Sequence, residues 1–131
     1  MGAEIHDRLL QAAKEARKNA YARYSGLKVG AAVLTEDGQI YTGCNVENIS
    51  YGATMCAERV AVFKAISEGY DKIMAIAVVA DLPNPISPCG MCLQVLNEFG
   101  RNATVLMANT TGDMRLSSVE KLLPNEFKLE R

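Results

Sequence analysis

The chain has 131 residues, the size of one domain with a single core. Its 14 Lys and Arg nearly balance 15 Asp and Glu, and no basic run is present that would favour nucleic acid or an anionic membrane. Charges interrupt residues 1–20 and no apolar run has membrane-spanning length, so we expect a cytoplasmic protein without signal peptide or membrane helix. Four cysteines are then expected to be metal ligands or reduced core residues rather than disulfides.

The first half of the chain predicts one helix and a hairpin. Residues 4–20 place apolar side chains at helical spacing with charges on the other face, which predicts an amphipathic helix. Residues 27–33 alternate as in a strand, Glu36-Asp37-Gly38 is typical of a tight hairpin turn, and residues 39–44 are predicted to be the returning strand. Residues 45–53 lack periodicity but are rich in hydrogen-bonding side chains, which indicates an ordered loop.

Two helices and a buried strand are predicted next. Thr54 is the expected N-cap of a helix over about residues 55–68. Residues 73–80 are almost continuously apolar, which favours a buried central strand. Ser87 is the expected cap of a second helix, with Pro88 at its first position and its end near residue 99.

The last segment predicts a strand and a short helix. Residues 104–108 form the strand, and Ser117 with Glu120 has the pattern of a capping box before Pro124. Strands and helices therefore alternate after the first hairpin. That order predicts an α/β layered domain with a mixed sheet.

Three cysteines have the spacing of ligands to one metal ion. Cys56 lies near the start of one predicted helix, and Cys89 and Cys92 lie three residues apart, hence on one face, at the start of the next. Zinc sites with three protein ligands leave a fourth position open and are the catalytic ones. The partial positive charge of helix N-termini stabilises the thiolates that zinc requires. The sequence thus predicts a catalytic Zn²⁺ site where two helix N-termini meet.

Two charged residues follow the first cysteine. Three thiolates on Zn²⁺ leave a net negative charge, which opposes the acidification of a bound water. Arg59, three residues after Cys56, is predicted to donate a hydrogen bond to a ligand sulfur. Glu58 is predicted to face the water and the substrate as a proton shuttle. This combination favours metal-assisted hydrolysis.

Two other interpretations of the cysteines remain open. Cys89 and Cys92 could form a redox pair, although the pattern lacks a thioredoxin-like strand placement and leaves out Cys56. A structural zinc needs a fourth ligand. Cys44 is the candidate for that ligand, because the single histidine, His6, lies in a predicted surface helix.

Three stretches carry a resemblance to a known family: GCNVEN at residues 43–48, CAER at 56–59 and SPCGMCLQVL at 87–96. They resemble the small homotetrameric cytidine deaminases, whose zinc signature joins a His or Cys followed by x-Glu to a later Pro-Cys-x-x-Cys. The similarity covers almost the whole chain. It implies a single three-layer α/β/α domain over residues 1–131 with a mixed five-stranded sheet.

The resemblance implies roles for individual residues. Cys56, Cys89 and Cys92 match the zinc ligands, and Glu58 matches the glutamate that protonates the base and later the leaving amine. The main chain around Ala57 matches the part that binds the amino group and ring. In the loop before this motif, Asn45 and Glu47 match the pair that binds the ribose 3′-hydroxyl. In isolation, a turn-stabilising Asn and a solvated Glu would be the alternative.

Two further residues match positions at the family's subunit contacts. Phe127 matches an aromatic that covers the base bound by a neighbouring subunit, and Tyr51 matches a residue at the subunit contact. The expected assembly is therefore a homotetramer whose active sites are completed by neighbours. As isolated residues, each could instead be ordinary packing, with Phe127 anchoring the last turn. The chain departs from the family at Leu27 and Leu93, where Phe and Arg are usual; we expect these departures to affect specificity and the charge beside the sulfurs.

The resemblance implies hydrolytic deamination of cytidine and deoxycytidine to uridine and deoxyuridine plus ammonia, in pyrimidine salvage. A modified cytidine or a blasticidin-S-like aminopyrimidine is an alternative substrate. A non-catalytic, zinc-stabilised assembly protein is a third possibility. We expect a small nucleoside as the partner, with neither nucleic acid nor membrane bound. The sequence does not decide between ribose and deoxyribose.

Overall fold

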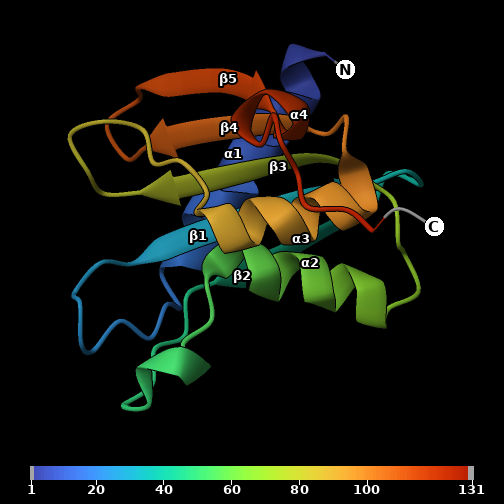
Figure 1. Ribbon diagram of the computed structural model, residues 1–131. Helices are drawn as coiled ribbons and strands as arrows, with labels where there is room; N and C mark the ends of the chain where they lie inside the picture. The colour runs from blue at the N-terminus through green and yellow to red at the C-terminus, as the bar shows by residue number, and fades with distance from the viewer. Residues whose placement is uncertain (1, 130–131) are drawn as a thin grey trace.

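The computed structural model describes residues 2–129, so three residues of the expected 1–131 domain lie outside the described part. One mixed sheet has the strand order β2-β1-β3-β4-β5 (Figure 1). Only β3 and β4 are parallel; the other neighbours are antiparallel. The strands are β1 (Val29–Thr35), β2 (Ile40–Cys44), β3 (Ile73–Ala80), β4 (Thr104–Asn109) and β5 (Met114–Ser118).

Helices cover both faces of this sheet. Figure 1 shows α1 (Ala3–Arg17) on one face, and α2 (Ala57–Ser67) side by side with α3 (Gly90–Gly100) on the other. A 3₁₀ turn, η1 (Tyr51–Ala53), precedes α2, and the short α4 (Val119–Leu122) follows β5. The predicted three-layer α/β/α fold with a mixed five-stranded sheet is confirmed. Within residues 2–129, no helix combines the length and apolar character needed to cross a membrane.

The central strands separate two hydrophobic cores. In β1, Val29, Ala31 and Val33 face α2 and α3, whereas Ala32 and Leu34 face α1. The strand is buried along its whole length, because β2 and β3 flank it and helices cover both faces. The alternation expected from the sequence is thus an alternation between two cores rather than between core and solvent.

The reading of the sequence in chain order missed β5. This edge strand pairs with β4 from Thr104–Ser118 to Ala108–Met114. Its apolar side chains Met114 and Leu116 alternate with Arg115 and Ser117 but are exposed, and this alternation is too short to predict a strand by itself. The available signal was the turn before it, where Gly112 has a φ of 104°.

Three expected helix caps are wrong by one or two positions. Cys56, not Thr54, is the N-cap of α2, because Met55 is still extended and exchanges two backbone hydrogen bonds with Val46. Cys89, not Ser87, is the N-cap of α3, and its sulfur accepts a hydrogen bond from the backbone N–H of Cys92 at 3.5 Å. Two candidate zinc ligands are therefore cap residues.

The third cap lies at the start of α4. Ser118 caps this helix, its Oγ accepting from the Lys121 N–H at 3.2 Å. Ser117 is instead paired with Val105 in the sheet. Ser118, the last residue of β5, is thus both paired with Thr104 and the cap of α4, so the cap lies one residue after the position that the capping-box pattern predicted.

Gly43 lets α2 approach the sheet closely. A Cβ at this position would lie 2.5 Å from the backbone N of Ala61 and 2.6 Å from the carbonyl O of Ala57. Backbone cannot move aside as a flexible side chain can, so we expect Gly43→Ala to lower the free energy of unfolding by about 2 kcal/mol. Urea denaturation measures the change. Gly2→Ala, which enters open space, is the control and should change stability by less than about 0.5 kcal/mol; equal effects of the two variants would contradict the argument.

Candidate active site

Three sulfurs meet where α2 and α3 begin. The Sγ atoms of Cys56, Cys89 and Cys92 all lie within 4.8 Å of one another, and those of Cys89 and Cys92 are 3.3 Å apart. Cys44 is a free thiol outside this group, so the closed four-cysteine site has no support within residues 2–129. Both helix N-termini direct backbone N–H groups and positive dipole ends towards the sulfurs, which favours thiolates there.

The electrostatics of the three sulfurs fit a cation. A hydrogen bond from Cys92, together with Arg59, lowers the pKa of the Cys56 thiol to about 5 despite its burial. The pKa of Cys92 is raised, chiefly because its thiol supplies that hydrogen bond. Crowded sulfurs thus cannot all ionise by themselves. A Zn²⁺ ion would supply the missing positive charge and accepts thiolate ligands in a three-cysteine set.

Arg59 is the positive group next to the sulfurs. Its Nη2 donates to Cys56 Sγ at 3.3 Å, and this hydrogen bond raises the pKa of the guanidinium. Its Nε is buried and has no hydrogen-bond partner among residues 2–129. Leu93 stands where the resemblance leads one to expect Arg, so a positive charge is missing at this position. Its side chain is buried, only 6% exposed.

Glu58 is a buried carboxyl beside the cysteine cluster. It lies in the first turn of α2 and is only 5% exposed. Burial raises the pKa of Glu58 to about 7, and the negative charge of Cys56 adds to the rise. A carboxyl with such a pKa can both hold and release a proton near neutral pH, which is what a general acid–base requires.

A cavity of about 250 Å³ connects these groups to a second set of polar side chains. One wall carries Cys56, Ala57, Glu58 and Cys89. The remaining lining comes from the start of β1 and from the loops before β1, α2 and α3: Ser25, Leu27, Val29, Asn45, Glu47, Thr54, Met55, Ile86 and Ser87. One cavity therefore brings together an acid–base group, candidate metal ligands and hydrogen-bonding side chains.

Comparison with known proteins agrees with this arrangement. Residues 3–108 match the family described as the cytidine and deoxycytidylate deaminase zinc-binding region. This chain belongs to that family. A cytidine deaminase from Sporosarcina psychrophila is 50% identical over 125 residues, covering 95% of this chain and 92% of its own length. A crystal structure of cytidine deaminase from Burkholderia pseudomallei has a TM-score of 0.90 at 50% identity, covering 93% of this chain and 98% of that one. A blasticidin-S deaminase from Bacillus cereus is less similar, at 30% identity over 107 residues and 76% of each chain.

In this deaminase fold, Asn45 and Glu47 both make contacts within the chain. Asn45 is 8% exposed; its Oδ1 accepts from the Val29 N–H at 2.8 Å and its Nδ2 donates to the Leu27 carbonyl at 2.9 Å. Glu47 accepts from the backbone N–H groups of Tyr24 and Ser25 and from the Ser25 hydroxyl. Each side chain thus stabilises the loop before β1, and each keeps some hydrogen-bonding capacity.

Phe127 and Tyr51 do not line this cavity. The side chain of Phe127 is 71% exposed and that of Tyr51 is 78% exposed. Tyr51 packs edge-on against Tyr24, with ring centroids 6.3 Å apart, over an adjoining hollow of about 350 Å³. Within one chain, neither aromatic can therefore cover a ligand in the cavity.

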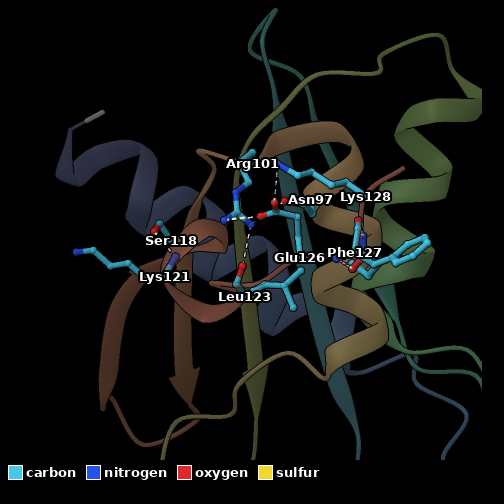
Figure 2. Close-up of polar contacts among 9 residues, drawn as sticks. Asn97, Arg101, Ser118, Lys121, Leu123, Glu126, Phe127 and Lys128 are labelled. Carbon is cyan, nitrogen blue, oxygen red and sulfur yellow. Dashed lines mark hydrogen bonds and ion pairs between the residues drawn. The ribbon is translucent and has the colours of Figure 1, made fainter. Parts of the chain in front are cut away.

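The segment that carries Phe127 is nevertheless firmly attached to α3. Gln94 donates from Nε2 to the Phe127 carbonyl at 2.9 Å and accepts from the Phe127 N–H through Oε1 at 3.2 Å. Figure 2 shows Arg101 between the Leu123 carbonyl, at 2.8 Å, and the Glu126 carboxylate, at 2.6 Å. The backbone of the C-terminal segment is thus tied to the helix that begins at the cysteine cluster, while the Phe127 ring is left free.

Reasoning from the sequence missed several lining residues of the deaminase cavity. Met55 was expected inside a helix and Ser87 as a helix cap. Neither Ile86 nor Ser25 was among the predicted site residues. The hydrogen-bond partner of Ser25, Glu47, lies 22 residues later in the chain. The available signal was therefore indirect: the family resemblance at Glu47 pointed to the residues that contact this side chain.

Proposed function

We propose that the protein deaminates cytidine and deoxycytidine to uridine and deoxyuridine with release of ammonia, as a cytoplasmic enzyme of pyrimidine salvage. One observation carries the proposal: a single cavity joins the buried Glu58 carboxyl and the cysteine cluster to the side chains of Asn45 and Glu47. The 50% identity to a protein named cytidine deaminase supports the same substrate.

The cysteine cluster and Glu58 would perform the chemistry. Cys56, Cys89 and Cys92 would hold Zn²⁺, which would supply a water molecule that is nucleophilic at neutral pH. Glu58 would take up in turn the two protons that this water loses, and would pass the first to the ring nitrogen N3 of the base and the second to the departing amine. Arg59 draws electron density from Cys56 Sγ through its hydrogen bond. Burial of Glu58 keeps bulk water from competing for these protons.

Asn45 and Glu47 would bind the sugar. Glu47 carries three hydrogen bonds to its two oxygens, and a carboxylate has about four acceptor positions. One position is therefore left for a sugar hydroxyl, and the second Nδ2 proton of Asn45 is a matching donor. Ala57 lines the same cavity, and its main chain would bind the amino group and ring of the base.

The charge of the cavity favours a nucleoside over a nucleotide. Its described lining has no Lys or Arg and carries the Glu47 carboxylate, whose pKa is lowered by the hydrogen bond from the Ser25 hydroxyl. A phosphate here would meet a negative charge without a counter-charge. Leu27 leaves more space on the wall than Phe would, so a modified cytidine is the second candidate substrate.

Ammonia release from cytidine, deoxycytidine, CMP and a modified cytidine tests the proposal. We expect release from the two plain nucleosides and little from CMP. Activity confined to the modified base would replace the proposed substrate, and no release from any of the four by zinc-loaded protein would contradict the function.

The exposed aromatics support a homotetramer in which neighbours complete each site. Phe127 would reach the cavity of another subunit, and Tyr51 would lie at the contact. The attachment of the C-terminal segment to α3 favours this role, because a fixed backbone presents an exposed ring in one direction. Sedimentation of the zinc-loaded protein tests the assembly, and a monomer would contradict it.

Gln94 should control how firmly that segment is held. Gln94→Ala removes both hydrogen bonds to the Phe127 backbone, so we expect amide hydrogen exchange in residues 124–129 to rise about tenfold. Mass spectrometry of the C-terminal peptide measures the exchange. Gln11→Ala, on the exposed side of α1, is the control; equal exchange in the two variants would show that Gln94 does not hold the segment.

A further inference from the structure

Ser25 connects the two parts of the cavity wall that would contact sugar and base. It lines the cavity in the turn before β1. Its Oγ accepts a hydrogen bond from the Leu27 N–H at 3.0 Å and donates one to Glu47 Oε2. The direction of both bonds is determined, because a backbone N–H can only donate and an ionised carboxylate can only accept. The single hydroxyl proton of Ser25 is therefore committed to Glu47.

The hydrogen bonds of Glu47 show what this proton does. Oε1 is occupied by two backbone N–H groups, those of Tyr24 at 2.8 Å and Ser25 at 3.0 Å. Oε2 has Ser25 Oγ as its hydrogen-bond partner within residues 2–129. A carboxylate oxygen accepts about two hydrogen bonds, so the position left for a ligand is on Oε2. The side chain of Ser25 thus supplies the one hydrogen bond that the described residues make directly to the oxygen that remains available, alongside the two that hold Oε1.

We propose that Ser25 is a positioning residue for the substrate, which directs Glu47 Oε2 at a sugar hydroxyl and fixes the backbone of the cavity-wall residue Leu27. The inference rests on the proposed nucleoside function. It goes beyond that function by assigning sugar recognition to a pair of residues rather than to Glu47 alone. Loss of the hydroxyl would remove one of the three hydrogen bonds that orient the carboxylate and leave the Leu27 N–H without its acceptor.

The test compares Ser25→Ala with the wild type on two substrates. On cytidine we expect KM to rise about tenfold with kcat nearly unchanged, because a charge-assisted hydrogen bond that orients bound substrate is lost equally from the ground and transition states. On 3′-deoxycytidine, which lacks the hydroxyl expected to meet Oε2, the same substitution should change KM by less than about twofold. Ser25→Thr keeps a hydroxyl and should restore most of the affinity.

Ser67→Ala is the matched control, because its hydroxyl donates to a backbone carbonyl at the far end of α2; it should leave KM unchanged on both substrates. The inference is overturned if Ser25→Ala leaves KM for cytidine unchanged, or raises it equally on 3′-deoxycytidine, since a general disturbance of the loop would not depend on the hydroxyl. Failure of Ser25→Thr to restore affinity would also count against it. An inactive wild type would instead remove the proposed function, and this inference with it.

Discussion

Glu58→Gln should reduce the rate of ammonia release from cytidine by about 10³-fold while leaving the fold intact. Gln has nearly the shape of Glu, so it fills the same buried site at the start of α2. It cannot accept and return a proton, however, and the burial that raises the pKa of Glu58 to about 7 shows how closely this carboxyl is matched to proton transfer near neutral pH. The expected loss is therefore in kcat, because proton transfer to the base belongs to the transition state.

Steady-state kinetics and metal analysis of the same preparation distinguish a loss of proton transfer from a loss of zinc. The variant should keep its zinc, since Glu58 is not one of the three clustered thiols. Glu36→Gln, which alters an exposed carboxylate paired with Lys72 outside the cavity, is the control and should retain most activity. Full activity of Glu58→Gln would exclude Glu58 as the proton shuttle. A wild type that binds zinc but releases no ammonia from any nucleoside would favour the non-catalytic assembly protein.

The sequence predicted the parts of the site whose geometry depends on nearby residues. Cys89 and Cys92 share a face because residues three apart on a helix do so, and Arg59 lies next to Cys56 for the same reason. The apolar run of β3 predicted a central strand correctly, because both faces of that strand are covered and apolar side chains occupy both. In these cases the spacing of residues within a single helix or strand was sufficient for the prediction.

Features that depend on distant partners could not be predicted in the same way. Cys56 is the cap of α2 because Met55 is still extended and pairs with Val46, nine residues earlier in the chain. Val46 lies in a loop without periodicity, so the sequence pattern did not predict this pair. Ser25 joined the site through Glu47, 22 residues away. The edge strand β5 has only five residues, and its two apolar side chains do not extend the pattern enough to predict it. Whether Phe127 reaches a ligand depends on other subunits, which no pattern within one chain describes.

Cys92→Ser should lower the bound zinc from about one ion per chain to near zero and abolish deamination, because a serine hydroxyl is a poor substitute for a thiolate ligand. Cys92 is fully buried and is one of the three clustered thiols. We expect the thermal unfolding midpoint to fall as well, since a metal that binds only the folded state stabilises it.

Cys44→Ser provides the matched control for this experiment. It makes the same replacement of sulfur by oxygen at the one cysteine outside the cluster. Zinc content by atomic emission, activity and unfolding midpoint should all remain near wild-type values. Loss of zinc in Cys44→Ser would restore the four-cysteine structural site and contradict the open coordination that hydrolysis requires. Retention of zinc and activity in Cys92→Ser would show that the metal is held elsewhere. Only the expected pair of results, loss in one variant and none in the other, supports a three-thiolate site with a position left for reaction.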